Sequence, residues 1–257
     1  MKVKANGISI NYQIDGPEHA PWLVFSNSLA TSLSMWDEQA AALKDRFRVL
    51  RYDQRGHGGT DAPAGRYAFD TLLDDALALM DALGIAKANF TGLSMGGATA
   101  LGLAERSSAS SSPIHLANRR RKALSNGKSA SRWRRSKASR LWSSRPSCAG
   151  FRTETIASNP PYLDKIRAMI RATPVNGFVG CAAALAAHDY ASAVASVKCP
   201  TLFIVGEKDG ATPAAMAKLH DKIPGSRFAT LPGAGHISNM DRASEFNRAL
   251  RDFLTKA

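Results

Sequence analysis

The sequence predicts an α/β fold, with a mostly parallel sheet and helices on both of its faces. Short apolar runs alternate with segments of helical periodicity, which is typical of strand–helix–strand units. A serine bracketed by glycines stands between one such run and a helix-like segment, within residues 92–97. Polar residues follow two later apolar runs, at 207–209 and at 235–236. Since the carboxyl ends of parallel strands share one edge of a sheet, these three groups are expected to meet there.

The individual elements follow from local patterns. The chain is expected to open with an antiparallel hairpin reaching about Ile14, because Asn6-Gly7 is the preferred two-residue turn between two extended stretches. Buried strands are predicted at 22–25, 49–52, 89–91, 201–205 and 228–231. Helices are predicted near 35–43, at 72–83, at 98–105, within 161–190 and at 243–253. Gly84 is expected to stop the second of these helices.

Length and composition exclude several classes of protein. With 257 residues and 44% hydrophobic residues, the chain suits one large domain, or one domain with a modest insertion. No apolar run approaches the roughly 18 residues of a membrane helix, and the first residues lack the apolar stretch of a secretory signal. We therefore expect no membrane partner and a cytoplasmic location. Cys148, Cys181 and Cys199 form no C-x-x-C pair, so neither a disulfide framework nor a metal site is expected.

The net charge of +13 comes from one segment. Residues 107–150 contain eleven Lys and Arg, thirteen Ser and no Asp or Glu. The rest of the chain carries 23 basic and 21 acidic residues, a near-neutral balance that is common in globular enzymes. The basic excess is thus a property of this basic block, residues 107–150, and not of the whole protein.

The most specific motif is Gly92-Leu93-Ser94-Met95-Gly96-Gly97. It matches G-x-S-x-G between a strand and a helix, the arrangement that presents a nucleophilic serine on a sharp turn. Such a turn needs small neighbours because its backbone is strained and tightly packed. The helix that follows directs free N–H groups toward developing negative charge. The alternative is a plain glycine-rich turn, which the strand before and the helix after make less favourable.

A serine hydroxyl needs a base and an orienting carboxylate, which in this architecture follow in the order Ser, Asp, His. Asp209 follows the strand predicted at 201–205, and His236 follows the strand predicted at 228–231. The sequence therefore predicts a catalytic triad of Ser94, Asp209 and His236. Glu207 is the rival carboxylate. The rival bases do not follow a late strand with small flanking residues; they are His19, His57, His115, His188 and His220.

With these motifs the chain resembles serine hydrolases of the α/β-hydrolase superfamily and, within it, 3-oxoadipate enol-lactonases. The matching stretches are 26–30 (Ser-Asn-Ser-Leu-Ala), 33–36, 51–58, the serine turn and 235–239 (Gly-His-Ile-Ser-Asn). The resemblance implies hydrolysis of 3-oxoadipate enol-lactone to 3-oxoadipate, in the β-ketoadipate pathway of aromatic degradation. It implies a small-molecule lactone or ester substrate, no cofactor, no bound metal and a helical cap over the site.

The same resemblance implies an oxyanion hole made by the backbone N–H groups of Leu29 and Met95. An Asx turn at Asn27 is the alternative for that loop. Arg55 and His57 are interpreted as parts of a structural loop, with substrate binding as the other reading. The substrate carboxylate is expected to meet a cation of the cap, and the candidates, left unranked, are Arg152, Lys165, Arg167 and Arg171.

Two other functions stay open. A general carboxylesterase or a C–C hydrolase would use the same triad, whereas a dehalogenase would need a carboxylate in place of Ser94. From a different class, the chain could be an inactive hydrolase-like protein whose basic block binds nucleic acid, a partner that we do not expect for the enzyme.

The basic block also sets the predicted domain limits. Residues 1–106 and 191–257 are predicted to form the hydrolase core, and 107–190 a core strand plus the cap region. The family resemblance stops at Arg106 and resumes at about 152, and the block between shows no buried-strand pattern. We therefore hypothesise two compensating frameshifts, near codons 107 and 150. The rival is a natural nucleic-acid-binding insertion with Trp133 and Trp142 stacking on bases, but a selected insertion would normally add to a fold and not replace a core strand.

Overall fold

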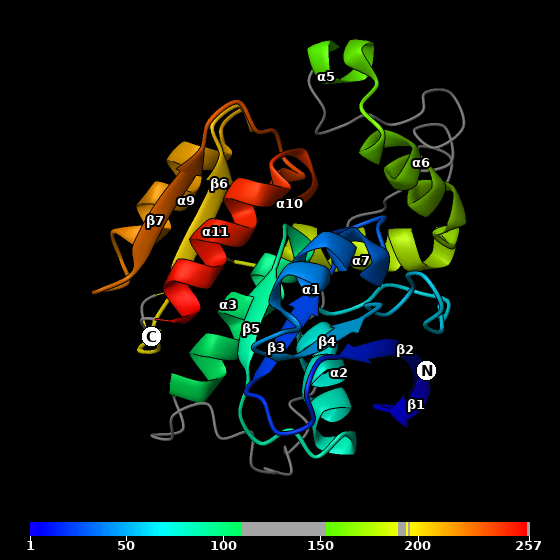
Figure 1. The fold of residues 1–257 in the computed structure, drawn as a ribbon. Helices are drawn as coiled ribbons and strands as arrows, with labels where there is room; N and C mark the ends of the chain where they lie inside the picture. The colour runs from blue at the N-terminus through cyan, green and yellow to red at the C-terminus, as the bar shows by residue number, and fades with distance from the viewer. Residues whose placement is uncertain (109–152, 190–193, 195, 256–257) are drawn as a thin grey trace.

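The computed structural model describes residues 1–108, 153–189, 194 and 196–255 (Figure 1). The strands are β1 (Lys2–Ala5), β2 (Ile8–Asp15), β3 (Trp22–Ser26), β4 (Arg48–Tyr52), β5 (Asn89–Gly92), β6 (Leu202–Gly206) and β7 (Arg227–Leu231). The helices of the first half are η1 (Leu33–Trp36), α1 (Asp37–Leu43), α2 (Phe69–Ala82) and α3 (Met95–Ser108). Those of the second half are α5 (Thr153–Ser158), α6 (Tyr162–Ala172), α7 (Val175–Ala187), α9 (Thr212–His220), α10 (Ser238–Asp241) and α11 (Ala243–Leu254).

The element predictions are confirmed in type, and the five predicted buried strands agree with the structure to within one residue. Asn6 and Gly7 have φ of 45° and 76°, as a type I′ hairpin turn requires, and Gly84 follows α2 with φ of 68°. The helix predicted near 35–43 is preceded by the 3₁₀ turn η1, and α3 begins three residues earlier than predicted, directly after the serine. The end of the predicted 161–190 segment lies outside the described residues.

The main sheet has the order β1-β2-β4-β3-β5, with β3 parallel to both β4 and β5. Its central strands alternate between two apolar clusters. Leu23, Phe25 and Val49 belong to the cluster with α1 and α11, while Val24 and Leu50 belong to the cluster with α2 and α7. Helices thus cover both faces, as a parallel sheet requires. The predicted α/β-hydrolase architecture is confirmed.

Among the described residues, no further strand continues the main sheet beyond β5. Strands β6 and β7 pair with each other in parallel and form a separate two-stranded sheet, drawn to the left of β5 in Figure 1. In the part of the chain that the structure describes, no strand bonds to the edges of β5 and β6 that face each other. A cavity of about 1190 Å³ lies between them, lined along its length by both strands and by α3. The side chains of Phe90 and Thr91 in β5 are consequently half-buried, unlike Val24 and Phe25 in neighbouring β3.

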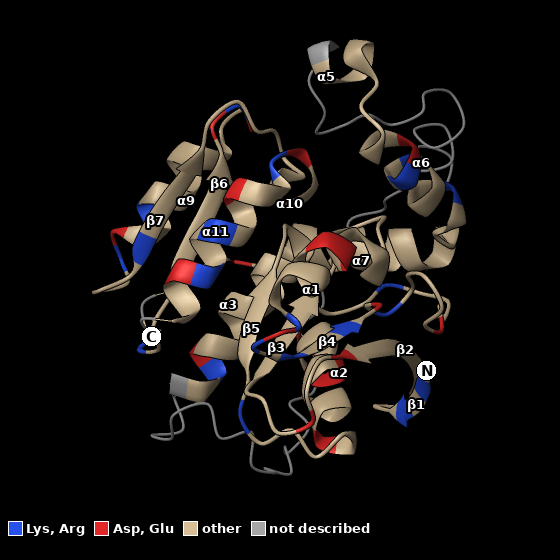
Figure 2. Ribbon diagram, in the orientation of Figure 1, with Lys and Arg blue, Asp and Glu red and all other residues tan. Residues whose placement is uncertain are grey.

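The predicted loss of a core strand concerns residues 107–150. Of these, Ser107 and Ser108 form the end of α3, and 109–150 lie outside the described residues. The predicted domain limits at 106 and 191 stay a prediction, since 190–193 also lie outside. In the view of Figure 2, Lys and Arg are interspersed with Asp and Glu over the described elements.

Within the described ranges, no single helix is long and apolar enough to cross a membrane. Only α6 and α7 taken together reach that length and composition, and a bend of 98° separates them. Cys181 and Cys199 are free thiols, and Cys148 lies outside the described residues. Burial raises the pKa of Cys181 to about 12, so this thiol is unreactive at neutral pH.

Candidate active site

Ser94 occupies a strained turn between β5 and α3. Its φ is 54°, in the left-handed region, and its side chain is exposed. The flanking glycines are required by close packing: a Cβ on Gly92 would lie 2.0 Å from the carbonyl oxygen of Gly96, and a Cβ on Gly96 would lie 2.1 Å from that of Ser26. The strand–turn–helix context predicted for the motif is therefore present, and the turn leaves the Ser94 side chain exposed.

The loops after β6 and β7 bring Asp209 and His236 together. These loops pack closely, since a Cβ on Gly206 would lie 2.2 Å from the carbonyl oxygen of Gly235, and the Lys208 N–H donates to Ala234 O at 2.8 Å. His236 Nδ1 lies 2.8 Å from Asp209 Oδ2. With the proton on Nδ1, the other ring nitrogen, Nε2, carries the lone pair that a general base needs. Ser94, Asp209 and His236 line the same cavity.

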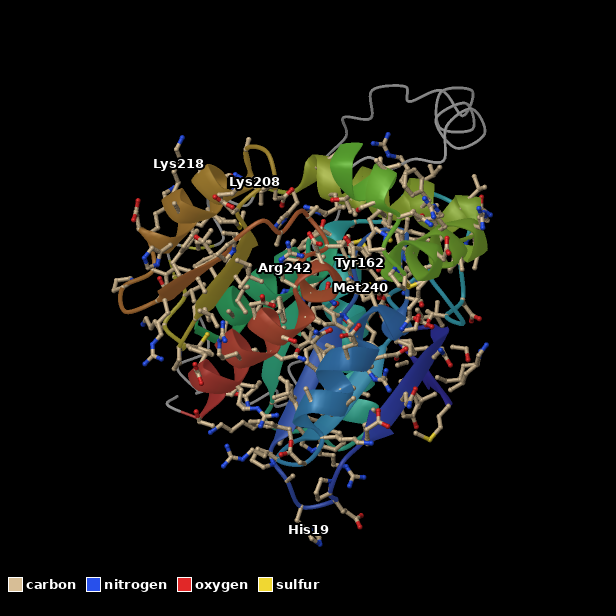
Figure 3. All side chains as sticks on the ribbon, turned by 45° about the horizontal axis from the view of Figure 1, so that its top comes forward. His19, Tyr162, Lys208, Lys218, Met240 and Arg242 are labelled. Atoms are coloured by element: carbon tan, nitrogen blue, oxygen red, sulfur yellow. The ribbon has the colours of Figure 1, made fainter. Side chains whose placement is uncertain are left out.

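The rival residues are engaged elsewhere. Glu207 accepts a hydrogen bond from the Gly233 N–H at 2.8 Å and lies 3.3 Å from the Lys208 ammonium group. His19 lies at the far end of the molecule, at the bottom of Figure 3. The imidazole of His188 stacks on Phe69, and that of His220 bonds to Ser226 Oγ. His57 is fully buried, and His115 lies outside the described residues. Of the described histidines, only His236 lines the cavity beside Ser94.

The loop of residues 26–31 is held by its own buried asparagine. Asn27 Nδ2 donates to the carbonyl oxygens of Ser28 and Thr31, at 2.9 and 3.1 Å. Asn27 Oδ1 accepts the Gln54 N–H at 2.8 Å, and among the described residues the Leu29 N–H does not donate to it as an Asx turn would require. Gln54 Nε2 donates in return to Asn27 O at 2.7 Å. The loop is thus fastened to the segment after β4.

The backbone N–H groups of the 26–31 loop and of the serine turn differ in whether they have an acceptor. Ser28 N–H donates to Met35 Sδ and Ala30 N–H donates to His57 Nε2. By contrast, the N–H groups of Leu29 and Met95 donate to no acceptor within the described part of the chain. Met95 is the first residue of α3, where a helix leaves its N–H groups unbonded. These are the two N–H groups that the resemblance implies for an oxyanion hole.

Several hydrogen bonds join the loop that carries His236 to neighbouring elements, and most of them could not be predicted from the sequence. Asp241 Oδ2 accepts the Gly235 N–H at 2.7 Å, and its Oδ1 accepts the Tyr162 hydroxyl of α6 at 3.0 Å. In Figure 3, Tyr162 at the start of α6 lies near Met240 of α10 and near Arg242, the residue that follows α10. Burial and the Asp241 carboxylate raise the pKa of Tyr162, so the phenol acts as the donor. Asn239, part of a motif that carried the resemblance, donates to Met35 O at 2.8 Å and so joins the loop to η1.

The charged candidates for substrate binding are mostly paired. Arg55 forms a bidentate buried ion pair with Asp75, at 2.6 and 2.7 Å, which supports its reading as a structural residue. The cap residues Lys165 and Arg167 pair with Asp37 and Asp164. Arg171 is exposed, and Arg152 lies outside the described residues. Within the described ranges, no three His, Cys, Asp or Glu side chains gather where they could hold a metal ion.

The α/β fold with a strained serine turn between a strand and a helix is typical of α/β hydrolases, and the comparison with known families agrees. The model of the alpha/beta hydrolase family matches residues 22–249, so the chain belongs to this family and is a hydrolase by class. The matched range runs through the basic block.

Three individual proteins are similar to this chain over nearly its whole length. The chain is 34% identical to 3-oxoadipate enol-lactonase 1 of Acinetobacter baylyi, over 99% of this chain and 96% of the relative. The solved enol-lactonase of Burkholderia xenovorans has a TM-score of 0.82 at 35% identity, covering 99% of this chain and 100% of that one. A putative carbamate hydrolase of Stutzerimonas stutzeri is 29% identical, over 96% and 97% of the two chains.

Proposed function

We propose that this protein hydrolyses 3-oxoadipate enol-lactone to 3-oxoadipate, with Ser94 as nucleophile, His236 as base and Asp209 as the orienting carboxylate. The observation that carries the proposal is the bond between His236 Nδ1 and Asp209 Oδ2, 2.8 Å long, beside a cavity that Ser94 also lines. The names of the similar enol-lactonases support the substrate and its place in the β-ketoadipate pathway. The chemistry needs no cofactor.

The reaction begins when His236 Nε2 takes the proton of the Ser94 hydroxyl as Oγ attacks the lactone carbonyl carbon. Asp209 fixes the Nδ1–H tautomer and stabilises the imidazolium that forms. The carbonyl oxygen becomes an oxyanion, which accepts hydrogen bonds from the N–H groups of Leu29 and Met95. Collapse of this intermediate breaks the ring C–O bond, the His236 imidazolium gives its proton to the leaving enolate oxygen, and an acyl-enzyme on Ser94 remains.

The leaving oxygen is that of an enol, and this favours ring opening. An enolate is a better leaving group than an alkoxide, and the released enol can tautomerise to the ketone. The leaving group remains attached to the acyl chain because the ester is cyclic. Water, deprotonated by His236, then attacks the acyl-enzyme and releases the product with Ser94 restored.

The proposal is tested by turnover of purified, folded protein on three substrates: 3-oxoadipate enol-lactone, p-nitrophenyl acetate and an N-alkyl carbamate ester. We expect the highest kcat/KM on the enol-lactone. Faster hydrolysis of the simple ester would favour a general carboxylesterase. Preference for the carbamate would favour the activity named for the Stutzerimonas relative. Turnover of none, together with salt-dependent binding to random DNA that disappears on deletion of 107–150, would favour the inactive nucleic-acid-binding alternative.

The identity of the carboxylate can be tested by a matched pair of substitutions. We expect Asp209→Asn to lower kcat by about three to four orders of magnitude, because an amide no longer holds the Nδ1–H tautomer of His236. Glu207→Gln is the control, and it should stay within about fivefold of the native enzyme because Glu207 bonds to the Gly233 N–H. Steady-state kinetics on the best substrate measures both. A larger loss in Glu207→Gln would reassign the carboxylate.

A further inference from the structure

The segment after β4 contains an imidazole that touches the proposed oxyanion loop. His57 is fully buried, and its Nε2 lies 2.9 Å from the backbone nitrogen of Ala30. Its Nδ1 lies 3.0 Å from the carbonyl oxygen of Arg55. Both ring nitrogens are therefore bonded to backbone groups, and neither faces the cavity beside Ser94.

These two partners fix the protonation of the ring. A backbone N–H can only donate, so Nε2 must present a lone pair to Ala30. The single proton of the neutral ring then sits on Nδ1 and is donated to Arg55 O. Burial lowers the pKa of His57, and this effect is larger than the raising effects of Arg55 O and the Asp53 carboxylate. The ring is therefore neutral at pH 7. A protonated ring would set an N–H against the Ala30 N–H.

The residue that His57 holds is in an unfavourable backbone conformation. Ala30 has φ of 60°, in the left-handed region, where a residue with a Cβ is strained. It directly follows Leu29, whose N–H has no acceptor within the described residues. Without a partner for its own N–H, the Ala30 peptide could relax out of this conformation and turn the neighbouring Leu29 peptide.

The two residues before His57, Arg55 and Gly56, are held by close contacts with α2 and α7. Arg55 O also accepts the Cys181 thiol of α7 at 3.3 Å, and the Arg55 guanidinium is locked to Asp75. Gly56 and Gly177 pack backbone to backbone, since a Cβ on Gly56 would lie 2.3 Å from the Cα of Gly177. His57 thus connects the α7 helix and the segment after β4 to the loop of residues 26–31.

We propose that His57 is a positioning residue of the reaction: by accepting the Ala30 N–H, it holds the 26–31 loop so that the Leu29 N–H stays directed at the oxyanion. This inference rests on the proposed function, because it needs an oxyanion beside Leu29. His57 does not touch the substrate; it acts through Ala30. The effect is accordingly on stabilisation of the transition state and not on substrate affinity.

Two substitutions separate the Ala30 bond from the rest of the imidazole. In His57→Gln the amide oxygen reaches the position of Nε2 and can accept the Ala30 N–H. In His57→Asn the shorter amide reaches only the position of Nδ1, where it can donate to Arg55 O but cannot reach Ala30. We expect His57→Asn to lower kcat about 100-fold with KM within about threefold, and His57→Gln to keep kcat within about fivefold.

The control is Thr60→Val, which removes buried hydrogen bonds of the same segment, to Asn11 N and Asp53 O, without touching residues 26–31. It should leave kcat within about threefold. Equal kcat losses in all three variants, or a His57→Asn effect confined to KM, would overturn the proposal. A native-like His57→Asn kcat would do the same. The proposed function fails separately, if Ser94→Ala retains activity.

A measurement on the native chain does not depend on how the variants fold. Histidine ¹⁵N spectra at pH 7 report the tautomer of each ring, and we expect the Nδ1–H tautomer for His57. Amide hydrogen exchange should show the Ala30 N–H protected. An Nε2–H tautomer, or rapid exchange of Ala30 in a chain whose Asp53 amide is protected, would overturn the assignment.

Discussion

Ser94→Ala is expected to lower kcat on the enol-lactone by about four to six orders of magnitude, because it removes the oxygen that forms the acyl-enzyme. The small rate that remains would come from the oxyanion donors acting on direct attack by water. KM should change much less, since the hydroxyl contributes little to binding of the ground state. Steady-state kinetics on the enol-lactone give both values, and burst kinetics on a chromogenic ester test for the acyl-enzyme.

The matched control for this variant is Ser107→Ala, at the other end of α3, where a serine lines the same cavity and bonds to Ala104 O. Its kcat should stay within about twofold of the native value. A phosphonate ester offers a second readout, since mass spectrometry should place one adduct on Ser94 in the native chain and none in Ser94→Ala. Activity that survives the loss of Ser94, or an adduct on another serine, would remove the triad.

The serine turn could be predicted from sequence because its constraints are local. A side chain at Gly92 would collide with Gly96, and a side chain at Gly96 would collide with Ser26 in the adjacent strand β3. The two glycines of the motif therefore indicate the turn by themselves. Asp209 and His236 are 27 residues apart, yet they were predictable because each follows a strand whose carboxyl end had to reach the same edge. What remained open was the choice between Asp209 and Glu207. The bond between His236 Nδ1 and Asp209 Oδ2 supports Asp209, and Glu207 accepts the Gly233 N–H instead.

The supporting contacts could not be predicted, because they join segments with no local pattern in common. Asn27 bonds to Gln54, His57 to Ala30 and Tyr162 to Asp241, across 27, 27 and 79 residues. Ala30 takes part only through its backbone N–H, and the other partners are ordinary polar residues whose own neighbours indicate only a loop or a helix surface. His57 illustrates this well: the sequence suggested a structural loop, which is consistent with its burial but does not reveal which loop it holds.

In the part of the chain that the structure describes, no strand joins β5 to β6. The flanking strands were predicted and are confirmed, and the question is what should lie between them. Both facing edges are parallel-strand edges without a partner among the described residues, and α3 covers the cavity between them on one side. Such edges are normally buried inside a continuous sheet.

Replacing residues 107–150 with the equivalent stretch of the Burkholderia enol-lactonase is therefore expected to raise both stability and activity. A parallel strand of about five residues would bond to both edges and bury about three apolar side chains, which would stabilise the fold by roughly 5–9 kcal/mol. For a chain of this size that corresponds to an increase in Tm of roughly 10–30 °C. The kcat should rise as well, since a strand bonded to both β5 and β6 would fix the loops that carry Ser94 and the Asp209–His236 pair relative to each other.

The control is a replacement of equal length made of Gly and Ser, which removes the basic charges of the block but supplies no strand. If the gain comes from the strand, only the enol-lactonase stretch should raise Tm, measured by calorimetry, and kcat on the lactone. Equal gains from both replacements would instead assign the effect to removal of eleven like charges. A native chain already as stable and as active as the chimera would mean that its own residues 107–150 complete the sheet, and the frameshift hypothesis would then be wrong.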